Sequence, residues 1–133
     1  MANTNDVYNT LLGKIDNLEK KIKSLEEDKK DSKGIKIQSG EYFEEFWKVK
    51  DHYLNNCNVG YRPVIKYISF KEQYKTPPQV LVSITGLECD NKSNSRVYIS
   101  AKDITISGFN LEIATYGESK IYYIRVNWMS FGN

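Results

Sequence analysis

Residues 120–130 read KIYYIRVNWMS, and two kinds of side chain alternate along them. Successive side chains of a β-strand point to opposite faces of the sheet, so this alternation predicts a strand with one apolar face. The set predicted to face a core consists of Tyr122, Ile124, Val126 and Trp128. The opposite set consists of Tyr123, Arg125, Asn127 and Met129. Large apolar side chains on an outer face often mark subunit interfaces, which is how we interpret Tyr123 and Met129.

The chain after residue 34 repeats this period of two. The predicted strands are Ile35–Ser39, Lys66–Lys71, Gln79–Leu87, Arg96–Lys102, Gly108–Tyr116 and Lys120–Ser130. The apolar sets of two of them are Phe109, Leu111 and Ile113, and Val97, Ile99 and Ala101. Turn-forming residues separate the strands, and no helical pattern intervenes. We therefore predict an all-β domain over residues 34–133, folded as a six-stranded antiparallel β-sandwich.

The first part of the chain has a different period, because residues 7–31 follow a heptad pattern. The a positions are Tyr8, Ile15 and Ile22, and the d positions are Leu11, Leu18 and Leu25. Lysines at g and glutamates at e allow ion pairs between parallel helices. Residues 1–33 are thus predicted to form an α-helical coiled coil and a linker; the alternative is an amphipathic helix packed on its own domain. Isoleucine at a with leucine at d favours a coiled coil of two helices.

Composition argues against several kinds of partner. The net charge is +2 and acidic residues lie among the lysines, so we expect no nucleic acid partner. The first ten residues are polar and no apolar run is long enough to span a bilayer, so we expect no membrane insertion. We expect the protein to be cytoplasmic at synthesis. The alternatives are export without a signal peptide and a location at the cell surface.

Few side chains in the sequence suit catalysis or metal binding. His52 is the only histidine and the two cysteines are Cys57 and Cys89, too few ligands for a zinc site. Residues 90–94 have oxygen ligands for Ca²⁺, but Lys92 among them favours a plain turn. We expect no cofactor, no metal and no enzymatic activity. The alternative of a glycosidase depends on the acidic residues Glu41, Glu44, Glu45 and Asp51.

Several short motifs, taken in order, resemble those of the H-type lectins, the family of the snail agglutinins and of the discoidin C-terminal domains. They include Ile37-Gln38-Ser39-Gly40, Trp47, Ile68-Ser69-Phe70, the segment from Pro77 to Thr85, Arg96, Gly108-Phe109 and Val126-Asn127-Trp128-Met129-Ser130. The resemblance covers residues 35–131. It implies a six-stranded β-sandwich that forms trimers, sometimes paired as hexamers. It also implies binding of galactose or N-acetylgalactosamine in clefts between protomers, without metal or cofactor.

The resemblance also implies which residues bind the sugar. The family's strand arginine corresponds to Arg96, its loop aromatic to Tyr116, and its last-strand tyrosine to Tyr122. A family histidine is replaced here by Gly117, and the family's acidic loop residue by Asn58, with Asn56 as a neighbouring candidate. We therefore predict a multivalent lectin for glycans ending in galactose or N-acetylgalactosamine. The alternative is a trimeric structural or attachment module, such as a fibre tip, without strong sugar binding.

Overall fold

A computed structural model describes residues 3–31, 34–50, 52–55 and 60–133 of the chain. The chain divides into two compact units, Met1–Gly34 and Ile35–Asn133. The first unit holds the helix α1 (Thr4–Asp31), and the second holds the six strands found among the described residues.

Helix α1 has the features expected of a helix that begins at a polar cap. The Asn3 side chain accepts a hydrogen bond from the Asn5 N–H at 3.4 Å, and Asp6 lies in the first turn, where a negative charge is favoured. The predicted a and d side chains are all exposed, from 51% for Ile15 to 67% for Leu25. The predicted helix is confirmed. Its pairing as a coiled coil stays a prediction, which the exposed apolar stripe favours because water is a poor solvent for it.

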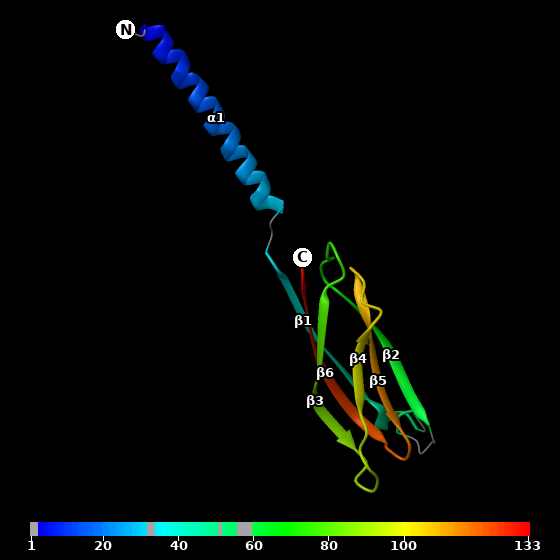
Figure 1. The fold of residues 1–133 in the computed structure, drawn as a ribbon. Coiled ribbons are helices and arrows are strands. Elements are labelled where there is room, and N and C mark those ends of the chain that lie inside the picture. The colour runs from blue at the N-terminus through cyan, green and yellow to red at the C-terminus, as the bar shows by residue number, and fades with distance from the viewer. Residues whose placement is uncertain (1–2, 32–33, 51, 56–59) are drawn as a thin grey trace. The chain divides into compact units, whose positions relative to one another are not determined.

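The second unit is a sandwich of two antiparallel sheets, as predicted (Figure 1). One sheet has the order β1-β6-β3 and the other β2-β5-β4. The strands are β1 (Lys36–Glu45), β2 (Tyr61–Ser69), β3 (Gln79–Cys89), β4 (Tyr98–Lys102), β5 (Gly108–Tyr116) and β6 (Ile121–Gly132). A short 3-10 helix, η1 (Phe46–Lys48), follows β1.

Several predicted strand boundaries were wrong by two residues or more, and three of these errors have identifiable reasons. Strand β1 continues to Glu45 because residues 41–45, three of which are glutamates, still pair residue by residue with β6. Strand β2 begins at Tyr61, where the buried Arg62 hides the apolar alternation. Strand β4 begins at Tyr98 because the Arg96 N–H bonds the Ser119 hydroxyl, a side-chain partner rather than a strand partner.

The core lies between the sheets and is formed mainly by β5 and β6. The predicted inward residues Phe109, Leu111, Ile113, Ile124 and Val126 are all 0% exposed. Tyr122 is the exception in β6, because it is only half-buried whereas its neighbour Ile121 is fully buried. A register shift opposite it, between Glu88 and Cys89 of β3, interrupts the alternation at this point.

Gly40 explains how the Trp128 ring fits against β1. The two residues are opposite each other in the β1–β6 ladder. A Cβ atom at Gly40 would lie 2.7 Å from atoms of the Trp128 ring, which is 8% exposed. Only glycine leaves room for the indole there, which gives the Gln-Ser-Gly motif at the start of the domain a packing role.

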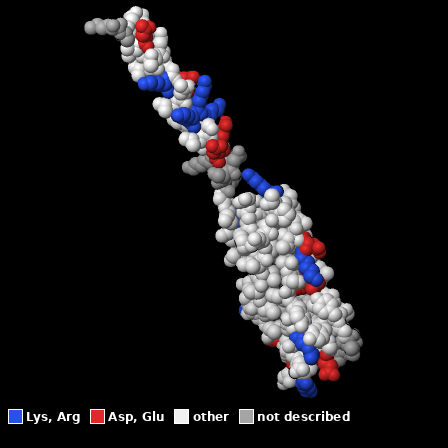
Figure 2. All heavy atoms as spheres, viewed as in Figure 1, with Lys and Arg blue, Asp and Glu red and all other residues white. Residues whose placement is uncertain are grey.

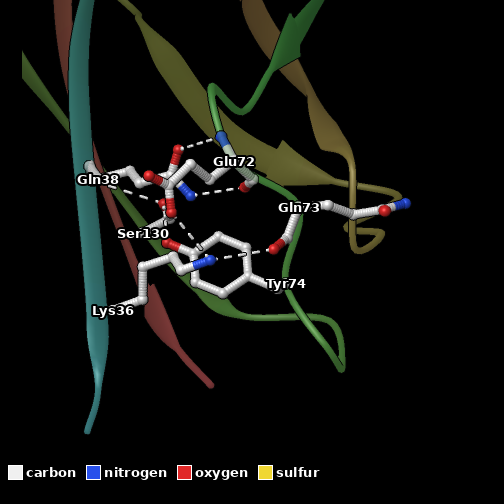
Figure 3. A network of polar contacts seen from close by, with 6 residues as sticks. All are labelled: Lys36, Gln38, Glu72, Gln73, Tyr74 and Ser130. Atoms are coloured by element: carbon white, nitrogen blue, oxygen red, sulfur yellow. Dashed lines mark hydrogen bonds and ion pairs between the residues drawn. The ribbon is translucent and has the colours of Figure 1, made fainter. Parts of the chain in front are cut away.

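A polar network at the start of β1 joins three parts of the sandwich (Figure 3). The Gln38 amide donates to the Glu72 carbonyl at 2.8 Å and accepts from the Glu72 N–H at 3.0 Å. The Lys36 Nζ pairs with the Glu72 carboxylate at 3.0 Å. The hydroxyls of Tyr74 and Ser130 are 2.8 Å apart in a buried hydrogen bond. This network ties the β2–β3 connection to β1 and β6.

Candidate functional site

Arg96 and Tyr116 meet although they are twenty positions apart in the chain. Arg96 lies just before β4, and Tyr116 is the last residue of the antiparallel neighbour β5. The guanidinium carbon of Arg96 lies 4.8 Å from the centre of the Tyr116 ring, within the range of a cation–π contact. Tyr98 stacks on the same ring, with centroids 5.8 Å apart and planes inclined by 23°.

The backbone of Arg96 is held by two buried hydroxyls. The Arg96 N–H donates to the Ser119 Oγ at 2.9 Å, and the Thr115 hydroxyl donates to the Arg96 carbonyl at 2.5 Å. Thr115 and Ser119 are both 0% exposed. The position of the Arg96 backbone is therefore set by the end of β5 and by the β5–β6 turn.

Gly117 completes this corner of the molecule. Its φ of +64° lies in the left-handed region, and a Cβ atom there would be 3.3 Å from the Arg96 Nη1. Glycine thus allows both the turn and the approach of the guanidinium. Of the residues predicted for the site, Arg96, Tyr116 and Gly117 lie together. Tyr122 is half-buried on β6, and Asn56 and Asn58 lie outside the described residues.

A shallow groove adjoins this corner on the outer face of β2-β5-β4. Its polar and aromatic lining consists of Tyr61, Tyr98, Ser100, Lys102, Glu112 and Tyr116. The Tyr61 hydroxyl donates to Glu112 at 2.6 Å, and the Lys102 Nζ lies 2.8 Å from the same carboxylate. The hydrogen bond from Lys102, and then that from Tyr61, lowers the pKa of Glu112. Glu112 is therefore an ionised acceptor although it is only 7% exposed.

Sequence reasoning missed Glu112 and Arg62, which are both buried and charged. Glu112 stands between the core residues Leu111 and Ile113, so its outward position follows from the period of two. That alternation was a usable signal. Arg62 had no such signal in the sequence, because the segments that enclose its side chain are remote from it in the sequence.

Three of the residues considered for other chemistry, Glu44, Glu45 and His52, have local structural partners. Glu44 accepts a hydrogen bond from Tyr42, and Glu45 pairs with Lys48. The Nδ1 of His52 accepts the Leu54 N–H at 3.1 Å, and burial lowers the pKa of this imidazole. Asp51 lies outside the described residues, and within those described no group of three or more His, Cys, Asp or Glu side chains could hold a metal ion.

Surface charge and the apolar character of the helices concern two of the predictions about partners, those on nucleic acid and on membrane insertion. On the face that Figure 2 shows, positive and negative side chains are interspersed. Among the described residues, no helix combines the length and the apolar character needed to cross a membrane.

Comparison with known proteins extends these observations. A sequence model of the H-type lectin domain matches residues 65–131, half of the chain. A discoidin-1 polypeptide of Dictyostelium discoideum is 26% identical over 81 residues, which are 60% of this chain and 32% of that protein. A Fuscovulum blasticum protein, described as ATP synthase subunits region ORF 7, is 33% identical over 66 residues, 50% of this chain and 57% of that protein.

A solved structure of recombinant discoidin II from Dictyostelium discoideum has a similar fold. The TM-score is 0.62 at 23% identity, and the match covers 76% of this chain and 39% of that one. The chain thus spans less than two thirds of the length of each of these relatives.

Proposed function

Since this chain belongs to the H-type lectin family, as its motifs predicted, we propose that it binds carbohydrate at the corner formed by Arg96, Tyr116 and Gly117. The observation that carries the proposal is the 4.8 Å approach of the Arg96 guanidinium to the Tyr116 ring. A sugar presents hydroxyl edges and apolar C–H faces. Arginine offers five N–H donors for neighbouring hydroxyls, and an exposed aromatic ring offers a flat surface for the C–H face.

The expected ligands are glycans that end in galactose or N-acetylgalactosamine. Tyr122, Asn58 and Asn56 are the further residues that we propose as contacts, by resemblance to the family. Gly117 stands where the family often has a histidine, so one polar contact to the sugar is missing. An asparagine in place of the acidic loop residue can still accept and donate, but without the charge that strengthens such a bond. We therefore expect weaker or altered specificity.

We further propose that function depends on an oligomer. One such site is expected to bind with a Kd of roughly tens of micromolar to millimolar, equivalent to about −6 to −4 kcal/mol. Several sites presented together raise the avidity without any new contact. The exposed apolar stripe of α1 favours pairing with copies of itself. We expect a trimer set by the larger sandwich domain, with a hexamer of paired trimers as an alternative.

A glycan array tests the carbohydrate proposal. The full chain is compared with the variant Arg96→Ala and with the control variant Arg125→Ala. Arg125 lies on β6, where it donates a hydrogen bond to the Thr85 carbonyl at 3.2 Å. Native mass spectrometry must give the same oligomer for all three. We expect binding to terminal galactose or N-acetylgalactosamine in the full chain and in Arg125→Ala, and its loss in Arg96→Ala.

The second candidate function is a structural or attachment module. The exposed apolar stripe of α1 favours it, and so do Gly117 and Asn58, which stand where the family has residues that bind the sugar. It predicts an intact oligomer with no signal from any glycan. Silence from the full chain on the array would therefore reject the lectin proposal and leave this one.

A further inference from the structure

Arg62 is a charged side chain enclosed in the end of the sandwich that carries the proposed sugar site. It lies on β2 and is 2% exposed. Its Nη2 donates to the Ser119 carbonyl at 2.6 Å and to the Gly117 carbonyl at 2.9 Å. Its Nη1 donates to the Tyr53 carbonyl at 3.1 Å. One guanidinium thus bonds the β5–β6 turn and the β1–β2 connection at the same time.

Stability alone is a weak reason for an arginine at this position. Removing a guanidinium from water is costly, and apolar side chains of similar volume are often as stabilising in such places. An apolar side chain, however, cannot bond two carbonyls of one turn. The fixed fork of N–H donors in arginine can, and it leaves little freedom to the carbonyls that it bonds.

The turn that Arg62 bonds is the one that positions the site. Gly117 directly follows Tyr116, and the Ser119 hydroxyl receives the Arg96 N–H at 2.9 Å. Movement of the turn would therefore displace both the ring and the arginine that we propose as sugar contacts. The other partner, Tyr53, precedes the buried Leu54, whose carbonyl accepts the Ile121 N–H at 2.8 Å and so joins the β1–β2 connection to β6.

We infer that Arg62 is a positioning residue for the sugar site. It holds the β5–β6 turn in the conformation that places Arg96 and Tyr116 side by side, and it does not touch the ligand itself. This inference rests on the proposed function for its binding readout. Its structural part, control of the turn, can be measured without any sugar.

The test compares Arg62→Lys and Arg62→Met with Arg125→Lys as the matched control. Lysine keeps the charge but lacks the fork, and methionine keeps apolar volume without any donor. N-acetylgalactosamine is titrated by NMR well below the unfolding temperature of each variant, and backbone amide exchange is measured in the same samples. We expect both Arg62 variants to bind roughly tenfold or more weakly, by analogy with the loss caused by replacing a residue that orients metal ligands. The Arg96 amide should exchange faster, whereas amides in the centre of β6 should not.

The outcomes separate positioning from mere stability. Arg125→Lys should leave both affinity and Arg96 exchange unchanged. Affinity within twofold of the unmodified chain in either Arg62 variant would overturn the inference. So would a uniform rise in exchange across the sandwich, or failure of both variants to fold, since either would assign Arg62 to general stability. If the unmodified chain binds no sugar, the proposed function fails, and unchanged Arg96 exchange in the variants would overturn the positioning role independently.

Discussion

Replacing Gly117 by alanine tests the geometry of the site at its most constrained backbone position. At φ +64° an L-residue with a Cβ atom costs about 1–2 kcal/mol relative to glycine. The new Cβ would also lie 3.3 Å from the Arg96 Nη1, so the guanidinium must move by a few tenths of an ångström, which can weaken its contact with the Tyr116 ring. An exposed cation–π contact is worth about 0.5–1 kcal/mol. We therefore expect Gly117→Ala to lower the free energy of unfolding by roughly 1–3 kcal/mol, with the upper value reached if the cation–π contact is lost completely.

The assay is thermal unfolding at one fixed protein concentration, because oligomers melt at concentration-dependent temperatures. In a domain of this size each kcal/mol lowers the Tm by about 4–8 °C. Gly117→Asn is the matched variant, since asparagine tolerates left-handed backbone but adds the same Cβ atom. We expect asparagine, the larger side chain, to be less destabilising than alanine. A Gly117→Ala protein as stable as Gly117→Asn would refute the strain argument.

Three further predictions concern other parts of the chain. The pKa of Glu112 is lowered on folding, so ionised Glu112 stabilises the fold fully at pH values above its ordinary pKa of 4.5, and this stabilisation is lost as the pH falls through the lower pKa of the folded state. The Tm of the unmodified chain should therefore exceed that of Glu112→Gln at pH 7, and the difference should shrink at low pH. A Tm difference that stays constant from pH 7 to pH 3 would contradict this prediction. Gln38→Ala removes both hydrogen bonds to the Glu72 backbone and should lower the free energy of unfolding by about 1–3 kcal/mol in urea titrations, whereas an unchanged midpoint would show that water replaces them fully. Leu18→Asp puts a charge at a d position of α1 and should reduce oligomer mass or raise the dissociation constant in analytical ultracentrifugation; no change would mean that α1 does not contribute to assembly.

The fold was largely predictable because strand and helix periods are local properties of the chain. Alternation in β5 and β6 correctly identified Phe109, Leu111, Ile113, Ile124 and Val126 as core. The heptad likewise predicted α1. The errors arose where pairing between strands overrode local pattern. The register shift opposite Tyr122 depends on the pairing of β6 with β3, and the extension of β1 to Glu45 depends on its pairing with β6. The sequence of a single strand reveals neither.

The residues of the candidate site were predictable from the sequence, but their contacts with one another were not. Arg96, Tyr116 and Gly117 were selected through the resemblance to a family, and their spacing alone would not have joined them. Their contact depends on the antiparallel pairing of β4 with β5 and on the left-handed turn at Gly117. Asn56 and Asn58 stay predictions.

The sequence by itself therefore determined the six strands, the helix, the two-sheet class and the family, because periodicity and short motifs involve residues that are close together in the sequence. Only the tertiary structure decided that Arg62 is enclosed with its guanidinium on the carbonyls of Gly117 and Ser119, and that Glu112 accepts from Lys102 and Tyr61. The physical reason is that burial and hydrogen-bond partners belong to pairs of remote segments. The residues next to an arginine or a glutamate in the sequence do not indicate which groups it will contact in the folded protein.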